Sequence, residues 1–185
     1  MNGYLNFQGL LFWRNGGWAF RLCLILISLS LAFTNTVIGE PFEYDSCISA
    51  DKELGDSAFW AVTSAKLYEE KEYSRAVAVV DVCFNRWGPE AGQQQKRLLE
   101  MNAKCPPTGR VNRHNRLSIE EDYLMNDVSF ALWVKARSLD ELGEVESAKS
   151  AYAQCLYMIC GRVWDPRGWF WSPAEDCIKY AKKLS

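Results

Sequence analysis

Residues 127–160 read DVSFALWVKARSLDELGEVESAKSAYAQCLYMIC, and this stretch decides the fold. Small and apolar residues recur in it at spacings of three and four, which predicts one amphipathic helix from about Asp127 to Glu141 and a second after Gly143. Glycine tolerates the positive φ of a tight connection, and so short a connection makes the helices antiparallel. The predicted buried stripe consists of Leu132, Ala136 and Leu139 in the first helix and Ala148, Tyr152 and Cys155 in the second.

The same pattern occurs 72 residues earlier, which is seen when Ala76 is aligned with Ala148. Asp56 or Ser57 can cap the first helix of this earlier copy. Lys71 stands where the later copy has its loop glycine. The positions that correspond to the later stripe are Trp60, Ser64, Leu67, Ala76, Val80 and Cys83.

The later copy has the spacing L-x3-A-x2-L-x3-G-x4-A-x3-Y-x2-C, which resembles the tetratricopeptide (TPR) repeat. The offset of the two copies is about twice the TPR period of roughly 34 residues, so a distorted repeat is expected between them. The resemblance implies an all-α fold for residues 56–185, namely a short TPR-like stack of antiparallel helical hairpins with a C-terminal capping helix.

The resemblance also implies a concave face, lined by the first helix of each hairpin, on which a peptide or a partner helix binds. Polar side chains at outward positions of these helices make a peptide groove plausible. The binding candidates on this face are Lys66 and Lys135, accompanied by Thr63, Glu70 and Arg137.

The segment between the hairpins is predicted to form a helix from Pro89 to Lys104, because proline is favoured in a first turn. The sequence CPPTG then ends this helix, and residues 110–117 are predicted to be a polar loop. Ser118-Ile-Glu-Glu121 matches a capping box and begins a helix that leads towards Asp127. Near the C-terminus, Ser172-Pro-Ala-Glu175 predicts the start of the helix that closes the stack.

Residues 1–39 are predicted to be a secretory signal peptide. They contain two arginines but no Asp, Glu or Lys, and an apolar run at residues 22–33 follows the second arginine. Small residues then suit cleavage after Gly39. An uncleaved anchor is the alternative, but the apolar run is shorter than the about 20 residues that a spanning helix needs. Residues 40–55 follow as an N-terminal arm, and a membrane location is expected only if the leader is retained.

Composition places the chain among ordered globular proteins. It has 185 residues, of which 49% are apolar and 24% charged, and its formal net charge is −2. This length suits one compact domain with a real core. The near-neutral charge and the predicted export argue against a nucleic-acid partner. No cofactor is expected.

Six of the seven cysteines follow the predicted leader, and an even number in an exported protein predicts disulfides. No metal site is expected, since no two cysteines are spaced as C-x2-C and His114 is the single histidine. Cys155 and Cys160 are expected near the end of one helix, about 7.5 Å apart along its axis, which is too far for a mutual disulfide. Cys47 precedes the first hairpin and Cys83 lies near its end, and antiparallel helices bring these positions together, so Cys47–Cys83 is the favoured bridge. Cys177 lies on the apolar stripe of the closing helix and is expected to bond to either Cys155 or Cys160, with Cys105 bound to the other.

The segment WDPRGWFW at residues 164–171 is the most conspicuous chemical feature. Followed by a capped helix, it resembles the C-terminus of small exported bacterial TPR-like proteins, some of which are described as glucanases. Trp164, Trp169 and Trp171 are candidates for stacking on a sugar or for holding a peptide. The alternative, favoured for most of these rings, is that they pack beneath the final helix, because aromatic side chains bury large areas.

A basic segment precedes the capping box and supplies Arg110, Arg113 and Arg116. These side chains are candidates for contact with an acidic partner, a phosphate or anionic lipid headgroups. A solvated loop is the more common explanation of such a segment. His114 lies within it and is not predicted to be catalytic.

No catalytic residue is predicted. Glycoside hydrolysis usually requires two carboxylates that face each other across about 5–10 Å, and Asp165 and Glu175, near the aromatic segment, are the one pair considered for this role. Glu175 is better explained as a helix-capping residue. The predicted function is an exported, non-catalytic scaffold that binds a peptide or protein or aids envelope assembly. The alternative is a carbohydrate-binding or glucan-acting protein that uses Trp164–Trp171.

Overall fold

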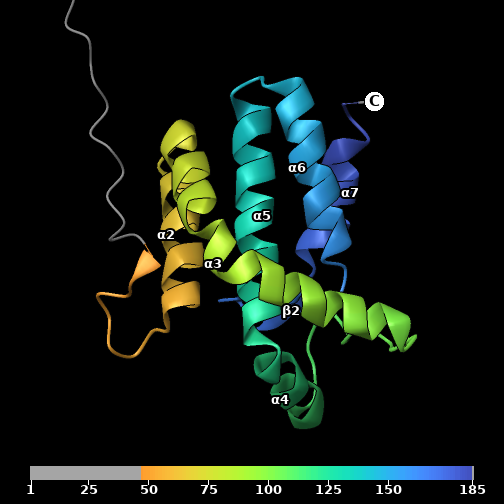
Figure 1. Cartoon of the computed structure of the whole chain (residues 1–185). Coiled ribbons are helices and arrows are strands. Elements are labelled where there is room, and N and C mark those ends of the chain that lie inside the picture. Colours follow the sequence, from red (N-terminus) through yellow and green to blue (C-terminus); the bar gives the residue numbers. More distant parts are fainter. Residues whose placement is uncertain (1–46, 185) are drawn as a thin grey trace, which may run out of the picture. The chain divides into compact units, whose positions relative to one another are not determined.

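The protein is described by a computed structural model over residues 47–184 (Figure 1). In chain order, the elements are α2 (Asp56–Glu69), α3 (Tyr73–Glu100), α4 (Arg113–Glu121), α5 (Tyr123–Glu141), α6 (Val145–Tyr157), β1 (Val163–Asp165), β2 (Trp169–Trp171) and α7 (Pro173–Ala181). The only sheet of the described residues has two short strands, so the predicted all-α class with a C-terminal helix is confirmed. The predicted signal peptide and most of the N-terminal arm lie outside the described residues. Between residues 47 and 184, no helix has the length and apolarity needed to cross a membrane.

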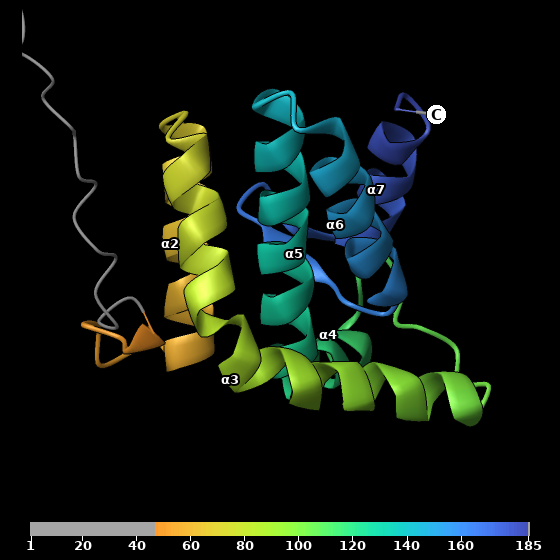
Figure 2. The ribbon, with the colours of Figure 1, turned by 45° about the horizontal axis from the view of Figure 1, so that its top comes forward.

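Helix α5 is the central element. It packs against α2 and α3 on one side and against α6 and α7 on the other, as Figures 1 and 2 both show. Its core-facing apolar side chains include Met125, Val128 and Leu132, which are almost completely buried. The core is therefore built around the helix that begins the stretch quoted first.

The two predicted hairpins are present, and their turns are equivalent. After α2, the amide of Lys71 donates to the carbonyl of Tyr68, and Lys71 has a φ of 64°. After α5, the amide of Gly143 donates to the carbonyl of Asp140, and Gly143 has a φ of 74°. Lys71 thus adopts the left-handed conformation that usually costs a non-glycine residue about 1–2 kcal/mol. All predicted stripe positions are buried: Trp60, Ser64, Leu67, Ala76, Val80, Cys83, Leu132, Ala136, Leu139, Ala148, Tyr152 and Cys155.

The prediction of a separate helix from Pro89 to Lys104 is wrong, because α3 is one helix of 28 residues with Pro89 inside it. Proline cannot donate to the carbonyl four residues earlier, and such a position bends a helix without necessarily ending it. Figure 2 shows the resulting sharp change of direction along α3. A Cβ at Gly88 would lie 2.5 Å from the Phe84 ring, so the glycine makes room for that ring at the bend.

The predicted loop at residues 110–117 is also partly wrong, because α4 already begins at Arg113. The side chain of Asn112 accepts a hydrogen bond from the amide of Asn115 at 2.9 Å, and this contact caps the helix. Ser118 therefore lies inside α4 and caps nothing. At Asp122 the backbone leaves helical geometry, with φ −89° and ψ 30°, and this residue separates α4 from α5.

The aromatic segment forms a β-hairpin. Strands β1 and β2 pair antiparallel, with Trp164 opposite Phe170. Phe170 also exchanges two backbone hydrogen bonds with Gly109, which lies in the connection that follows α3. Ser172 then accepts a hydrogen bond from the amide of Glu175 at 3.3 Å, so the predicted start of the closing helix is confirmed.

Three disulfides join the elements, and each agrees with the predicted pairing. Cys155–Cys177 links α6 to α7 and Cys105–Cys160 links the chain after α3 to the chain after α6, which resolves the predicted alternatives. Cys155 and Cys160 do not lie on one helix as predicted, because α6 ends at Tyr157 and Cys160 lies beyond it. The third bridge, Cys47–Cys83, ties the arm before α2 to α3.

Arg137, expected at an outward position, is buried instead, with 9% of its surface exposed. Its guanidinium donates to Glu141 at 2.8 Å and to the Tyr68 hydroxyl at 3.1 Å, and it forms an ion pair with Asp140 at 3.2 Å. It also stacks on the Tyr180 ring, 3.5 Å from the centroid. One side chain thereby joins α2, α5 and α7, so its role is structural.

Candidate functional site

A cleft of about 320 Å³ lies between α2, the α4–α5 junction and the β-hairpin. Because α5 packs against α2 and the hairpin follows α6, the walls come from segments that are far apart in the chain. The walls are mainly apolar, and their aromatic and aliphatic members include Val62, Ile119, Tyr123, Phe130, Trp164 and Phe170. Its polar and charged members are Glu120, Asn126, Asp127 and Arg162.

The large apolar side chains at this cleft are unusually exposed. Val62, Tyr123 and Trp164 have exposed fractions of 52%, 62% and 44%, whereas Ile119 and Phe170 are buried behind them. Exposed apolar side chains that lie singly need no explanation, but several around one concavity indicate a contact surface. The cleft can therefore bury an apolar group of a ligand or partner.

Asp127 is the titratable group of the cleft with the most perturbed pKa. The Ser57 hydroxyl on α2 donates to its carboxylate at 2.7 Å. Burial raises the pKa of Asp127 from its usual 3.8 to about 6, and the hydrogen bond from Ser57 offsets only part of that effect. The carboxyl therefore loses its proton close to neutral pH in largely apolar surroundings.

The other charged groups around the cleft have partners. Glu120 accepts from Arg116 at 2.7 Å, and the Arg116 guanidinium lies 4.9 Å from the centroid of the Trp164 ring. Two of the predicted binding candidates, Arg116 and Trp164, are thus brought together at the edge of the cleft. The ring of Trp164 also packs edge-on against Phe170, with the centroids 5.0 Å apart.

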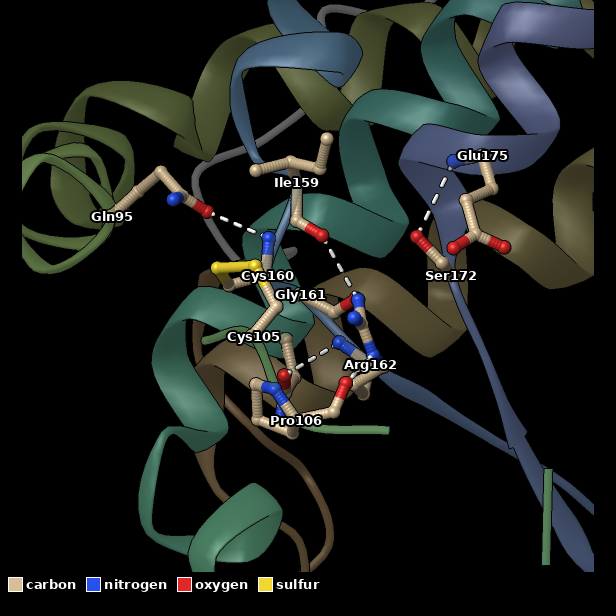
Figure 3. The surroundings of a disulfide bond; sticks show 10 residues. Gln95, Cys105, Pro106, Ile159, Cys160, Gly161, Arg162, Ser172 and Glu175 are labelled. Carbon is tan, nitrogen blue, oxygen red and sulfur yellow. Dashed lines mark hydrogen bonds between the residues drawn. A yellow bond between two sulfur atoms is a disulfide. The ribbon is translucent and has the colours of Figure 1, made fainter. Parts of the chain in front are cut away.

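Arg162 fixes the segment that carries the hairpin wall. Its guanidinium donates to the backbone carbonyls of Pro106, Ile159 and Gly161, as Figure 3 shows beside the Cys105–Cys160 disulfide. Burial lowers the pKa of Arg162, which stays bound to these carbonyls.

Asn126 and Gln95 hold the same segment from the helical side. The side chain of Asn126 accepts from the amide of Arg162 at 2.8 Å and donates to the carbonyl of Ile119 at 2.6 Å. The side chain of Gln95 accepts from the amide of Cys160 at 2.8 Å. The hairpin wall is therefore fixed by side-chain contacts as well as by a disulfide, and the cleft does not depend on a free loop.

A second, more polar cleft of about 290 Å³ lies at Trp169 and Trp171, beside α7. Glu175, Asp176 and Lys179 contribute its charged groups. Trp171 packs edge-on against Trp133 with the centroids 5.4 Å apart, so this ring is largely a packing element, as the alternative prediction held.

Asp165, one of the two carboxylates considered for hydrolysis, is hydrogen-bonded to a neighbouring arginine. Asp165 accepts from the Arg167 side chain at 2.9 and 2.8 Å. These hydrogen bonds and the charge of Arg167 hold the pKa of Asp165 at about 2. The Asp165 carboxylate is therefore ionised and paired with Arg167.

The remaining candidates do not line either cleft. Arg110 and Arg113 are exposed. Lys66 is exposed and forms a long 4.0 Å pair with Glu70. Lys135 donates to Asp81 of α3 at 2.6 Å and is therefore engaged within the helical layer.

Sequence reasoning missed Asp127, Val62 and Tyr123 as site residues, since these positions were interpreted only as parts of helices. For Asp127, the one signal available in the sequence was an acidic side chain at the start of a helix with an apolar stripe. Among residues 47–184, no group of three or more His, Cys, Asp or Glu side chains is placed to hold a metal ion. No known protein family matches the chain, and neither a curated protein nor a solved structure is significantly similar to it.

Proposed function

We propose that this protein is an exported, non-catalytic binding protein whose cleft between α2, α5 and the β-hairpin holds one side chain of a peptide or protein partner against its apolar wall. The observation that carries this proposal is the exposure of Val62, Tyr123 and Trp164 around one concave, aromatic-lined site. Leaving such side chains in water is unfavourable by about 25 cal/mol for each Å² of apolar surface, and a partner that covers them recovers this free energy.

The rest of the molecule suits this role. Three disulfides are typical of an oxidising compartment, which supports export. The helical hairpins, the disulfides and the contacts of Arg162 hold the walls of the cleft in place before binding. A preformed site lowers the entropy cost of association.

A second candidate function is carbohydrate binding at the polar cleft beside α7. Trp169 lies there with Glu175 and Lys179, and a ring next to charged hydrogen-bonding groups is a common arrangement for a sugar face. We favour the first cleft because its apolar side chains are exposed, whereas Trp171 of the second is occupied in packing against Trp133.

The test uses the purified chain with its disulfides intact, a library of acetylated hexapeptides in which one position is fixed, and a glycan array. We expect peptides with fixed apolar or basic residues to be retained, and Trp164→Ala to weaken retention about tenfold or more. Trp169→Ala is the matched control and should retain the peptides. Saturable glycan binding that is lost in Trp169→Ala, without peptide retention, would show that the second candidate is correct.

A further inference from the structure

Asp127 is the charged group at the first cleft that has no ionic partner among the described residues. Glu120 is paired with Arg116, and Arg162 is bound to three backbone carbonyls and interacts with Glu175. Asp127 receives a single hydrogen bond, from the neutral Ser57 hydroxyl. A carboxylate has about four acceptor sites, so most of its capacity is unused.

The surroundings of this carboxylate determine what can satisfy it. Tyr123, Phe130, Trp164 and Phe170 line the same cleft, and aromatic faces attract cations. An anionic group would be repelled by the ionised carboxylate, and a neutral apolar group would leave it unpaired in an apolar site. A cationic head on an apolar stem satisfies both the carboxylate and the rings.

We propose that the cleft binds a basic side chain of the peptide partner, with its aliphatic stem against the aromatic wall and its charged head at the carboxylate of Asp127. This inference rests on the function proposed above and specifies its ligand.

The proposal has a pH dependence. Because burial raises the pKa of Asp127 to about 6, the carboxylate is mostly ionised at pH 7.5 and mostly protonated at pH 5. The charged side chains that face the cleft from the packed elements are Glu120 from α4 and Arg162 from the segment before β1, and α2 contributes Ser57 and apolar residues. A basic peptide should therefore bind more weakly at pH 5 than at pH 7.5.

The experiment uses the hexapeptide library on the wild-type protein, Asp127→Asn and Glu121→Gln. Glu121 is an exposed carboxylate at the end of α4 that does not line the cleft, so Glu121→Gln removes one negative charge without touching the site. We expect peptides with lysine or arginine at the fixed position to be enriched on the wild type and on Glu121→Gln but not on Asp127→Asn. For the best lysine peptide, replacing lysine by norleucine should weaken binding about tenfold to a hundredfold at pH 7.5.

The outcomes separate the two proposals. Retention that depends on Trp164 but shows no basic preference, or that is unchanged in Asp127→Asn, overturns this inference and leaves the proposed binding function standing. If the wild-type protein retains no peptide above the blank, both proposals are wrong. The norleucine comparison uses only wild-type protein, so it decides the question even if a variant folds poorly.

Discussion

Replacing Asp127 by asparagine should stabilise the protein at neutral pH. The carboxylate is partly buried, with Ser57 as its one hydrogen-bond donor, so at pH 7.5 the folded state holds a poorly compensated charge. Asparagine has nearly the same shape, and its side-chain oxygen can still accept from Ser57. A stabilising substitution at the proposed ligand-binding carboxylate would be typical of a site where function takes precedence over stability.

The magnitude follows from the pKa of this carboxyl. The difference between the usual 3.8 and the folded-state value of about 6 corresponds to about 3 kcal/mol at neutral pH, at about 1.4 kcal/mol per pKa unit. Since the folded pKa is the higher one, the stability contributed by the protonated carboxyl is fully present below about pH 4 and is lost as pH rises through about 6. Because the Asp127 side chain is only partly buried, solvent screening relieves part of this cost, and we expect Asp127→Asn to raise the free energy of unfolding by about 1–3 kcal/mol at pH 7.5.

Urea unfolding with the disulfides intact, followed at pH 4 and pH 7.5, measures this difference. At pH 4 the variant and the wild type should have similar free energies of unfolding, and the gap should open between pH 4 and pH 7.5. Glu121→Gln should remain within about 0.5 kcal/mol of the wild type at both values, as expected for a surface substitution. If Asp127→Asn is destabilised at pH 7.5, or if its effect does not change with pH, then Asp127 is not the strained carboxylate described above.

Three further predictions concern stability. Peptide mapping without reduction should recover the three disulfides found in the structure. Their cysteines are separated by 36, 55 and 22 residues, and opening any one of these bridges should lower the free energy of unfolding, measured in urea, by about 3–4 kcal/mol. Gly161→Ala should lower the free energy of unfolding by about 1–3 kcal/mol, because the new Cβ would collide with the buried Ser129 side chain. Gly92→Ala, at an open helical position, is the control and should raise the free energy of unfolding by about 0.5–1 kcal/mol. Arg137→Met should cost about 2–4 kcal/mol in thermal or urea unfolding, because partly buried carboxylates lose their cation; an unchanged free energy of unfolding would contradict the structural role of this arginine.

The elements that depend on local periodicity were predictable from the sequence. The hairpin stripes recur at helical spacing, and even the unusual turn at Lys71 was placed by its alignment with Gly143. The disulfide pairing followed from the antiparallel hairpins, because these bring Cys47 close to Cys83. The capped closing helix was recognisable from Ser172 and the residues that follow it.

Two element boundaries were missed because a local signal had two physical meanings. Proline is favoured in a first turn, but it also occurs inside a bent helix, and at Pro89 the second meaning holds. Ser118 matched a capping box, but the helix was already capped by Asn112. Sequence spacing alone cannot decide between two such caps.

The candidate site was only partly predictable, because its residues meet through tertiary packing. Ser57 and Asp127 are 70 residues apart in sequence and meet only because α2 packs against α5. Trp164 was singled out for its chemistry, but its neighbours depend on where Asn126 and Arg162 anchor the hairpin. No periodic pattern in the sequence contains that information.

The most direct test of the binding cleft is an amide-resolved NMR titration of the purified protein with the best lysine-containing hexapeptide. Binding in the first cleft predicts saturable shifts of the signals of Val62, Asp127 and the Trp164 indole, with little change at Trp169 and Glu175. Shifts at Trp169 and Glu175, with the signals of the first cleft unchanged, would contradict it.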